Sequence, residues 1–367
     1  MNIINKIKKA NLVGRGGGNF PTAVKWEMVR KTTGNKKYII CNASEGEPGV
    51  KKDRYILENF GERVIDGMRI AIDFLLENPY SNSHPKEEGA QVKGYIYINH
   101  KYYKKFGKKL DKIILSNKIV YNKKNENNAS FSLRERTGKG NKKTQIKFFI
   151  KPASSGYIGG EETALLNAME GKRVEPRLRP PFPTTNGLWN CPTLVNNVET
   201  FYNVSLAIAD EYEKDRFYTI GGDCVSAGVY KLPDDWTIEK ILKETNNYPK
   251  FNFFVQVGGD ASGEILNSKQ LNKPAGGAGS ITIYNTKKYK PEEMIGKWIS
   301  FFVNESCGQC TPCREGVYRL NEIMNSDNPD WELLEELLNN LDEASFCGLG
   351  SIIPVPIRSY RRNVMGL

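Results

Sequence analysis

Three cysteines near the C-terminus follow one another at two-residue spacing, and they constrain the fold of this chain more than any other feature. Cys307, Cys310 and Cys313 lie in the segment SCGQCTPCREG, and Cys347 follows in SFCGLG. Three thiolates at this spacing can each bind one iron of a cubic cluster, and a distant fourth completes the coordination of a 4Fe-4S cluster. The chain must then fold so that Cys347 returns to the other three. We therefore predict an electron-carrying iron–sulfur site.

Zinc is the main alternative, because two CxxC pairs would place four thiolates around one ion. Here Cys347 stands alone, and His84 and His100 lie far upstream. The spacing therefore favours the cluster. A disulfide framework is less consistent still, because the total of seven cysteines is odd and three of them crowd into one short segment. The remaining cysteines are expected to be small, buried thiols: Cys41, Cys191 and Cys224.

The chain carries a formal net charge of +11, and much of the excess lies in one segment. Between His100 and Lys151, lysines alternate with tyrosine and phenylalanine in KYYKKFGKKLDK, and a Lys/Asn-rich stretch follows over 117–143. Aromatic residues mixed with lysine can bind single-stranded nucleic acid. No nucleic-acid-binding motif accompanies them, however. We expect a solvated, lysine-rich excursion and no nucleic-acid partner.

The longest apolar stretches are short, as in Ile70–Leu76, whereas about 20 residues are needed to span a bilayer. We therefore expect no membrane span. The N-terminal segment MNIINKIKKANL mixes lysines with apolar residues and lacks the hydrophobic core of a signal peptide. A reducing compartment also suits an iron–sulfur site and unpaired thiols. We expect a cytoplasmic protein.

The pattern of predicted elements changes twice along a chain long enough for two or three domains. After a first helix, strands over 36–41, 95–98 and 146–150 alternate with helices over 53–76 and 161–169, which is typical of an α/β layer. Short strands over 217–220, 228–231, 253–257 and 281–284 then surround one helix over 237–245. From Pro291 onward a 3.6-residue periodicity places the cluster cysteines at helix ends. The predicted domains are an α/β domain over 1–212, an α+β module over 213–290 and a helical domain over 291–367.

The segment Gly14–Pro21 reads GRGGGNFP and is too rich in glycine for ordinary structure. Glycines let backbone amides approach a phosphate closely, and Arg15 adds a positive charge. The segment departs from the dinucleotide fingerprint, because a basic helix precedes it and Asn19 occupies the position of the third glycine. A Rossmann NAD site is not expected here, and a surface turn is the structural alternative.

Three further polar segments follow predicted strands or precede predicted helices. NASEGEPG over 42–49 comes directly after a strand, where α/β proteins bind ligands, and its carboxylates suit sugar hydroxyls and ring nitrogens. GGEET over 159–163 begins a helix, so N-terminal capping is the alternative to ligand binding. VNNVET over 195–200 offers paired amides that could read an imide-like edge.

Together these segments resemble the flavoprotein subunit of respiratory complex I, which NAD-linked hydrogenases and formate dehydrogenases share. The resemblance covers nearly the whole chain through GRGGGNFPTAVKW, YIICNASEGEPGVKKDRYILE, YIGGEETALLNAMEGKRVEPRLRPPFPTTNGLWNCPTLVNNVETF and ESCGQCTPCREG with SFCGLG, in the family's order. It implies a Rossmann-like FMN domain, a β-grasp module of the soluble-ligand-binding (SLBB) type and a helical bundle holding one 4Fe-4S cluster.

The resemblance also implies the residues of each site. FMN would contact Gly14, Arg15, Gly16, Lys25, Asn42, Glu45, Tyr157, Gly160, Glu161, Val195, Asn196, Asn197 and Thr200. NADH would lie near Gly17, Phe20, Glu47, Glu162, Arg179 and Phe182. The rings of Phe20 and Phe182 offer flat faces to adenine. A carboxylate such as Glu162 near the adenosine ribose would repel a 2′-phosphate and favour NADH over NADPH. The cluster ligands would be Cys307, Cys310, Cys313 and Cys347.

Four positions depart from the family pattern. Ser44 stands where the family has aspartate, Asn19 where it has glycine, Met28 where an aromatic residue often flanks adenine, and Arg179 where it has lysine. The loss of an aromatic ring and a carboxylate is expected to act on nucleotide binding more than on flavin binding.

The resemblance implies an NADH dehydrogenase that moves a hydride from NADH to FMN and then single electrons to the cluster, with no acid–base side chain in the hydride step. The implied partners are a thioredoxin-like 2Fe-2S subunit and a larger iron–sulfur subunit. Two other functions are compatible with the same residues. One is a ferredoxin-linked NAD reductase that runs in reverse, and the other is a non-enzymatic electron-wiring subunit that no longer binds NADH.

Overall fold

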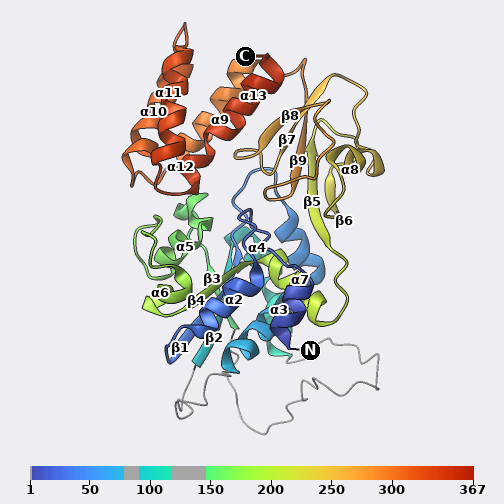
Figure 1. Cartoon of the computed structure of the whole chain (residues 1–367), viewed down its shortest axis with the longest axis vertical. Helices are drawn as coiled ribbons and strands as arrows, with labels where there is room; N and C mark the ends of the chain where they lie inside the picture. The colour runs from blue at the N-terminus through green and yellow to red at the C-terminus, as the bar shows by residue number, and fades with distance from the viewer. Residues whose placement is uncertain (1, 78–90, 117–145) are drawn as a thin grey trace.

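A computed structural model describes residues 2–77, 91–116 and 146–367 (Figure 1). The Lys/Asn-rich stretch over 117–143 lies outside these ranges. In the described part of the chain, no helix is both long enough and apolar enough to cross a membrane.

The first part of the chain forms a four-stranded parallel sheet in the order β3-β2-β1-β4 (Figure 1). Its strands are β1 (Lys36–Ala43), β2 (Gln91–Ile98), β3 (Ile146–Ile150) and β4 (Thr193–Asn197). Side chains alternate along β1, so that Ile39 and Cys41 join one apolar core and Tyr38 and Ile40 join another. The sheet is therefore buried on both faces, as parallel sheets usually are. The mixed α/β architecture with a parallel sheet is confirmed.

Helices cover the two faces of this sheet. They are α1 (Ile3–Lys9), α2 (Thr22–Lys31), α3 (Lys52–Leu76), α4 (His100–Leu115), α5 (Glu162–Met169), α6 (Pro183–Asn186) and α7 (Val198–Ile208). Short 3-10 turns lie at Ala153–Ser155, Ile158–Gly160 and Leu188–Asn190. The core on one face includes side chains of α3, α4 and α7, and the core on the other includes those of α5.

Helix α4 corrects one expectation. The solvated excursion predicted after His100 is wrong for residues 100–115, because this segment is an amphipathic helix. Phe106, Leu110 and Ile114 recur every four residues and are buried, while most of the lysines face outward. The helix packs closely on α3, where a Cβ atom built on Gly61 would lie 2.6 Å from the Leu110 side chain. The many lysines of this segment made its helical apolar stripe hard to recognise in the sequence.

The second part of the chain contains a five-stranded sheet in the order β6-β5-β9-β7-β8. Its elements are β5 (Asp215–Gly222), β6 (Gly228–Pro233), α8 (Ile238–Glu244), β7 (Phe253–Val257), β8 (Glu264–Asn267) and β9 (Ser280–Asn285). One face shares a core with α8 through Val255 and Ile283, and the other shares a core with the C-terminal helices through Phe254 and Ile265.

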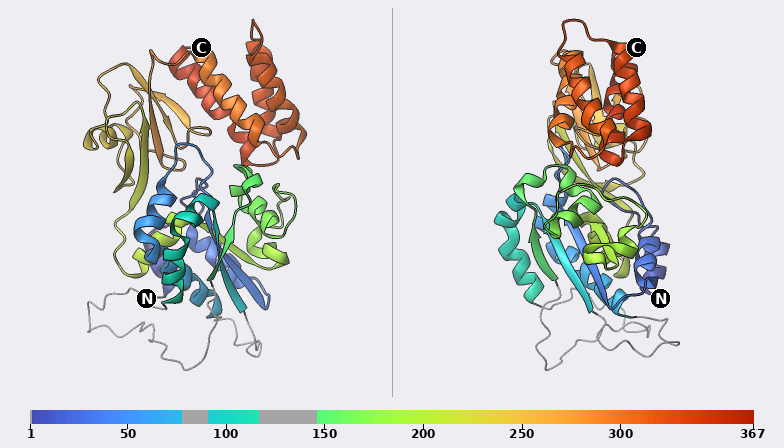
Figure 2. Two further views of the ribbon diagram at one scale, coloured as in Figure 1. Left: turned by 180° about the vertical axis from the view of Figure 1, so that it is seen from behind. Right: turned by 90° about the vertical axis from the view of Figure 1, so that its left-hand side faces the viewer.

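The last part of the chain is helical. It comprises α9 (Pro291–Glu305), α10 (Thr311–Met324), α11 (Trp331–Ala344), α12 (Gly348–Ile352), α13 (Pro354–Tyr360) and a π-helical turn at Arg361–Met365. The views of Figure 2 show these helices beyond the first sheet and its helices, at the opposite end of the molecule from the N-terminus. The predicted domain boundaries after residues 212 and 290 fall in connections, between α7 and β5 and between β9 and α9, and they remain predictions.

Candidate functional site

The predicted site residues lie around the carboxyl ends of β1 and β4, two neighbouring strands of the parallel sheet. Asn42 stands opposite Asn197 in the register of these strands. Because a parallel sheet collects its strand-to-helix turns along one edge, segments distant in the sequence meet there. The segments over 42–49 and 195–200 are thereby brought together.

The glycine loop is closed at its base and open at its tip. The amide of Gly14 donates to the Phe20 carbonyl at 2.9 Å, and Val13 forms an isolated bridge with Pro21. Residues 16–18 are exposed, and Gly17 has a φ of +109° that few other residues adopt. Asn197 lies beneath the loop, 3.5 Å from a Cβ atom built on Gly16. An exposed run of glycines of this kind can serve as a cradle whose backbone amides bind a phosphate.

The guanidinium of Arg15 is already paired. Its Nη2 donates to Asp234 Oδ2 at 2.8 Å and to the Tyr212 hydroxyl at 3.3 Å. The backbone amide of Arg15 donates to Thr200 Oγ1 at 3.0 Å. The backbone of Arg15 therefore belongs to the predicted site, whereas its charge is directed at a carboxylate beside the five-stranded sheet.

Two cations and two carboxylates from the predicted FMN and NADH sets form one cluster. Lys25 Nζ donates to Glu162 Oε2 at 2.7 Å and to the Val195 carbonyl at 3.0 Å. Arg179 contacts Glu161 at 3.1 Å and Glu162 at 3.4 Å. Glu161 also caps α5 by accepting from the backbone amides of residues 163 and 164. The capping role and the ligand role predicted for this turn are thus compatible.

The turns after β1 and before α5 are joined directly. Asn42 Nδ2 donates to the Gly160 carbonyl at 2.8 Å, and its Oδ1 accepts from the Ser44 hydroxyl at 2.7 Å. A Cβ atom on Gly160 would lie 2.8 Å from that hydroxyl, so this close approach favours glycine. Asn196, from the same predicted set, accepts from the Trp26 indole at 3.2 Å.

Glu47 links the same region to the five-stranded sheet. Its Oε2 accepts from the Tyr157 hydroxyl at 2.7 Å, and its Oε1 accepts from the amides of Ala261 and Ser262 at 3.0 and 3.1 Å.

The rings expected to flank adenine are those of Phe20 and Phe182, and each is 48% exposed. These rings are therefore accessible to a planar ligand.

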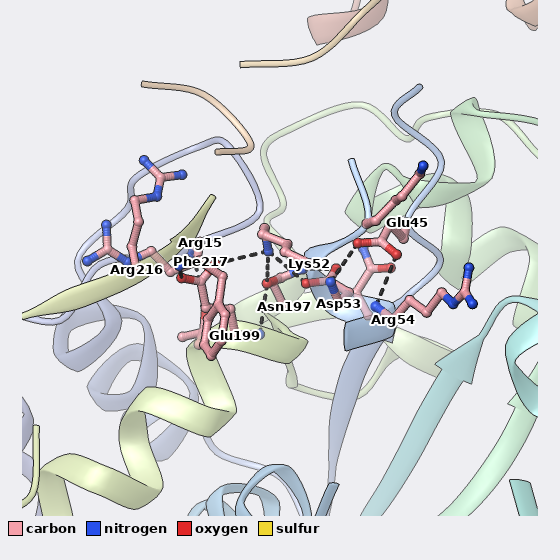
Figure 3. A network of polar contacts seen from close by, with 12 residues as sticks. Arg15, Glu45, Lys52, Asp53, Arg54, Asn197, Glu199, Arg216 and Phe217 are labelled. Atoms are coloured by element: carbon pink, nitrogen blue, oxygen red, sulfur yellow. Dashed lines mark hydrogen bonds and ion pairs between the residues drawn. The ribbon is translucent and has the colours of Figure 1, made fainter. Parts of the chain in front are cut away.

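A buried charge network lies beside these residues, and sequence reasoning assigned no role to its members Lys52, Asp53 and Glu199. Figure 3 shows Lys52 among Asp53, Asn197 and Glu199. Lys52 Nζ lies 2.7 Å from Asp53 Oδ1, 3.1 Å from Glu199 Oε2 and 3.0 Å from Asn197 Oδ1. Burial lowers the pKa of Lys52, but attraction by Asp53 and Glu199 outweighs it and leaves that pKa raised. Lys52 is therefore an ammonium that neutralises two buried carboxylates.

Glu45 closes this network at the start of α3 (Figure 3). Its carboxylate accepts from the amides of Asp53 and Arg54 at 2.6 and 3.0 Å and from the Tyr102 hydroxyl at 2.6 Å. Burial and the charge of Asp53 raise the pKa of Glu45 to about 7. The signal available in the sequence was KKDR, three basic residues and a carboxylate at the start of a helix with an apolar face.

The cluster cysteines lie at helix ends, as the periodicity predicted. Cys307 follows α9, Cys310 precedes α10, Cys313 lies in the first turn of α10, and Cys347 precedes α12. Burial, together with the other three thiols, raises the pKa of Cys313 to about 11. Among the described residues, no three His, Cys, Asp or Glu side chains are spaced to hold a single metal ion.

Hydrogen-bonding groups lie beside two of these sulfurs. The Ser306 hydroxyl lies 3.3 Å from Cys313 Sγ, and the amides of Leu349 and Gly350 donate to the Cys347 sulfur. Donors around cysteine sulfur are a recurring feature of iron–sulfur sites, because they stabilise the negative charge on the cluster. The four thiols and their donors fit a 4Fe-4S cluster.

The flavin-side turns touch the segment that carries the cysteines. The amide of Tyr157 donates to Glu305, the last residue of α9, and the Tyr157 ring meets Phe301 edge-on with centroids 5.4 Å apart. Arg173 donates to the carbonyl of Cys307 at 2.7 Å. The two predicted cofactor regions are therefore adjacent.

Comparison with known proteins agrees with this geometry. Residues 7–79 and 89–206 match the model of the Nuo51 FMN-binding domain, and residues 293–364 match that of the NADH-ubiquinone oxidoreductase-F iron-sulfur binding region. The F component of the NADH-quinone oxidoreductase of Aquifex aeolicus is 31% identical over 95% of this chain and 81% of its own length.

This chain belongs to the Nuo51 family of NADH-quinone oxidoreductase flavoproteins.

Hydrogenase subunits are related to the Nuo51 family as well. The NAD-reducing hydrogenase HoxS subunit alpha of Cupriavidus necator is 31% identical, with 97% of this chain and 58% of that protein covered. A crystal structure of NAD+-reducing [NiFe]-hydrogenase in the H2-reduced state has a TM-score of 0.80 at 26% identity, covering 99% of this chain and 61% of that one. The chain thus spans about three fifths of both hydrogenase chains. The resemblance inferred from the sequence motifs is confirmed.

The cofactors of the Nuo51 family fit the residues present. The FMN-binding match includes the glycine cradle and the polar turns after β1 and β4, and the iron–sulfur match contains all four cysteines. Sequence reasoning missed the residues that support these turns from elsewhere in the chain: Lys52, Asp53, Tyr102, Glu199, Asp234 and Glu305. Most of them act on partners far away in the sequence, and no local pattern marks such pairs.

Proposed function

We propose that this chain oxidises NADH at FMN and passes the electrons singly to a 4Fe-4S cluster. Bound FMN accepts a hydride and gives up electrons one at a time, which matches a two-electron donor to a one-electron cluster. The contact between the turn at Tyr157 and the segment from Glu305 to Cys307 carries the proposal. It brings the hydride-accepting site next to the electron-accepting one.

FMN is held, in this proposal, by the residues that meet at the carboxyl ends of β1 and β4. The amides of the glycine loop bind the phosphate, and Asn42, Asn196 and Asn197 supply polar groups below it. The rest of the proposed set lies around the same edge: Gly14, Arg15, Gly16, Lys25, Glu45, Tyr157, Gly160, Glu161, Val195 and Thr200. Their mutual hydrogen bonds keep these groups in place before the flavin arrives.

NADH is proposed to lie against the exposed rings of Phe20 and Phe182, near Gly17, Glu47, Glu162 and Arg179. Glu162 supports a preference for NADH, because its carboxylate would repel a 2′-phosphate. Lys25 and Arg179 partly neutralise that charge in the structure. The preference is therefore expected to be moderate. No side chain needs to transfer a proton in the hydride step, so the chain's part is to orient the donor and exclude water.

Electrons leave through the cluster proposed on Cys307, Cys310, Cys313 and Cys347. The proposed acceptors are a thioredoxin-like 2Fe-2S subunit and a larger iron–sulfur subunit, in a cytoplasmic complex. The five-stranded part is proposed to be a β-grasp module of the SLBB type, and the C-terminal helices a bundle that holds the cluster. The mixed sheet with one crossing helix and the position of the cysteines at helix ends support both assignments.

Purified, anaerobically reconstituted protein tests the proposal. NADH should bleach the flavin absorbance, and electron paramagnetic resonance should then show a reduced cluster. Cys313→Ser should retain flavin bleaching and lose the cluster signal, while Cys224→Ser, outside the proposed cluster, should behave as the wild type. Bound iron and flavin without bleaching by NADH would contradict NADH oxidation and favour a wiring subunit. Repeating the assay with NADPH measures the preference assigned to Glu162.

A further inference from the structure

The side chain of Arg15 is buried at a junction between two parts of the chain. It is 7% exposed, and its Nη2 lies 2.8 Å from Asp234 Oδ2 and 3.3 Å from the Tyr212 hydroxyl. Asp234 follows β6, where its own amide donates to the Lys214 carbonyl at 3.0 Å. The pair therefore joins the start of the glycine loop to the end of a strand in the five-stranded sheet.

Arg15 is the last residue held by backbone hydrogen bonds before the exposed glycines of the loop. Its amide donates to Thr200 Oγ1 at 3.0 Å, and the preceding amide, that of Gly14, donates to the Phe20 carbonyl. Residues 16–18 are exposed glycines. Glycine loses more conformational freedom on ordering than any other residue, so a fixed start to this run lowers the cost of forming the cradle.

The charge of Arg15 is better explained by this anchoring than by contact with an anion. A buried guanidinium must be paired, and the pair with Asp234 supplies the counter-charge. Glu199, also buried, adds a further attraction to the Arg15 side chain. A cation already held by a carboxylate at 2.8 Å offers little net charge to a phosphate in the cradle. The direct contribution to phosphate binding is left to the amides.

We propose that Asp234 is a positioning residue for the flavin site. Through Arg15 it holds the glycine loop in the conformation that binds the FMN phosphate. The inference rests on the proposed function, because it presumes that FMN occupies this loop. It gives the five-stranded sheet a part in flavin retention.

The test measures the rate of FMN release, followed as recovery of flavin fluorescence after dilution of the holoprotein. Asp234→Asn, Arg15→Gln and the double variant should each release FMN about tenfold faster than the wild type, which corresponds to about 1.4 kcal/mol. The three effects should be equal, because each change breaks the same link. Asp234→Glu, which keeps the carboxylate, should restore most of the retention.

A matched control comes from the same sheet. Asp215 pairs with Lys231 at 3.1 Å between β5 and β6, and Asp215→Asn should release FMN at the wild-type rate. FMN release is compared well below the melting temperature of each FMN-free variant, because breaking a buried ion pair lowers stability. The electron paramagnetic resonance signal of the cluster should be the same in every variant. If Asp234→Asn fails to fold, Tyr212→Phe removes the weaker contact to Arg15 and should give a smaller acceleration.

Two results would overturn the inference while leaving the proposed function standing. One is wild-type release in Asp234→Asn. The other is fast release in Arg15→Gln alone, which would show that the guanidinium contacts the phosphate itself. A wild-type protein that binds no FMN would instead refute the proposed function. The two failures are thus distinguishable.

Discussion

Replacing Lys52 with methionine tests the buried network most directly. Lys52 is 1% exposed and Glu199 is 0% exposed, and the ammonium lies within about 3 Å of the carboxylates of Asp53 and Glu199. Methionine fills similar volume without the charge. Two carboxylates then remain in the interior without their cation. The same side chains anchor Asn197, so the turn beneath the glycine loop is also affected.

The expected cost follows from the burial. Removing one partner of a buried ion pair costs about 3–5 kcal/mol, because the remaining charge stays desolvated. Lys105→Met is the matched control, since Lys105 pairs with Glu58 at 2.6 Å while both side chains are 40% exposed or more. An exposed pair of this kind contributes about 0.2–1 kcal/mol. Urea unfolding at pH 7.5, followed by tryptophan fluorescence, to which the buried Trp26 and Trp298 contribute, should separate the two variants by several kcal/mol.

The cost should also depend on pH. In the wild type, burial raises the pKa of Asp53 and the ammonium of Lys52 opposes that rise. Without Lys52, no ammonium opposes the rise in the pKa of Asp53, so this carboxyl group favours the folded state while protonated and disfavours it when ionised. The deficit of Lys52→Met should therefore shrink as the pH falls from 7.5 to 5.5. Adding Glu199→Gln should recover part of the loss at pH 7.5.

Two outcomes would refute this reasoning. A deficit no larger than that of Lys105→Met would mean that the ammonium does not neutralise the buried carboxylates. A deficit that is the same at both pH values would mean that the loss comes from packing and not from uncompensated charge.

Two further predictions concern single groups beside the cofactor sites. The pKa of Glu45 is raised to about 7 from 4.5, so wild-type stability should fall as the pH rises through this interval. The free energy of unfolding of Glu45→Gln should lack this fall, so it should rise relative to that of the wild type from pH 5 to pH 8. Equal pH profiles of the two proteins in urea unfolding would contradict this prediction. Ser306→Ala removes the hydroxyl 3.3 Å from Cys313 Sγ. The midpoint potential of the cluster should then fall, because a hydroxyl that donates to the sulfur stabilises the reduced cluster. A redox titration followed by electron paramagnetic resonance measures this potential. An unchanged potential would show that the hydroxyl does not donate to the sulfur.

The features that the sequence predicted correctly are those whose cause is local. The local periodicity placed Cys307, Cys310 and Cys313 at helix ends, where the structure has them. Strand β1 is a short apolar run bounded by polar residues. Helix α4 was missed because lysines flank Phe106 and Leu110 in the sequence, so only the four-residue spacing of these buried residues indicates a helix. Composition was the misleading signal, and periodicity was the informative one.

The pairing of charges could not be predicted in the same way. Lys52 and Glu199 lie on α3 and α7, and only the packing of these helices brings them together. Arg15 illustrates the same point at the site itself. Its charge and its place in a glycine loop suggested an anion ligand, but the counter-ion is Asp234, far along the chain. A sequence specifies which groups carry charge, whereas the fold decides which partner each one meets.

The contacts of the flavin-side turns explain why the three parts of the chain occur together. Glu47 is held by the amides of Ala261 and Ser262, and Arg15 by Asp234, so the five-stranded part contacts both the turn after β1 and the glycine loop. Glu305 of the helical part accepts from the amide of Tyr157. Electron transfer between two cofactors requires that their separation be fixed, and a flexible junction between domains would not fix it. The proposed flavin site is instead bound on two sides by the other parts, so its position relative to the cysteines is set by the same hydrogen bonds that shape it.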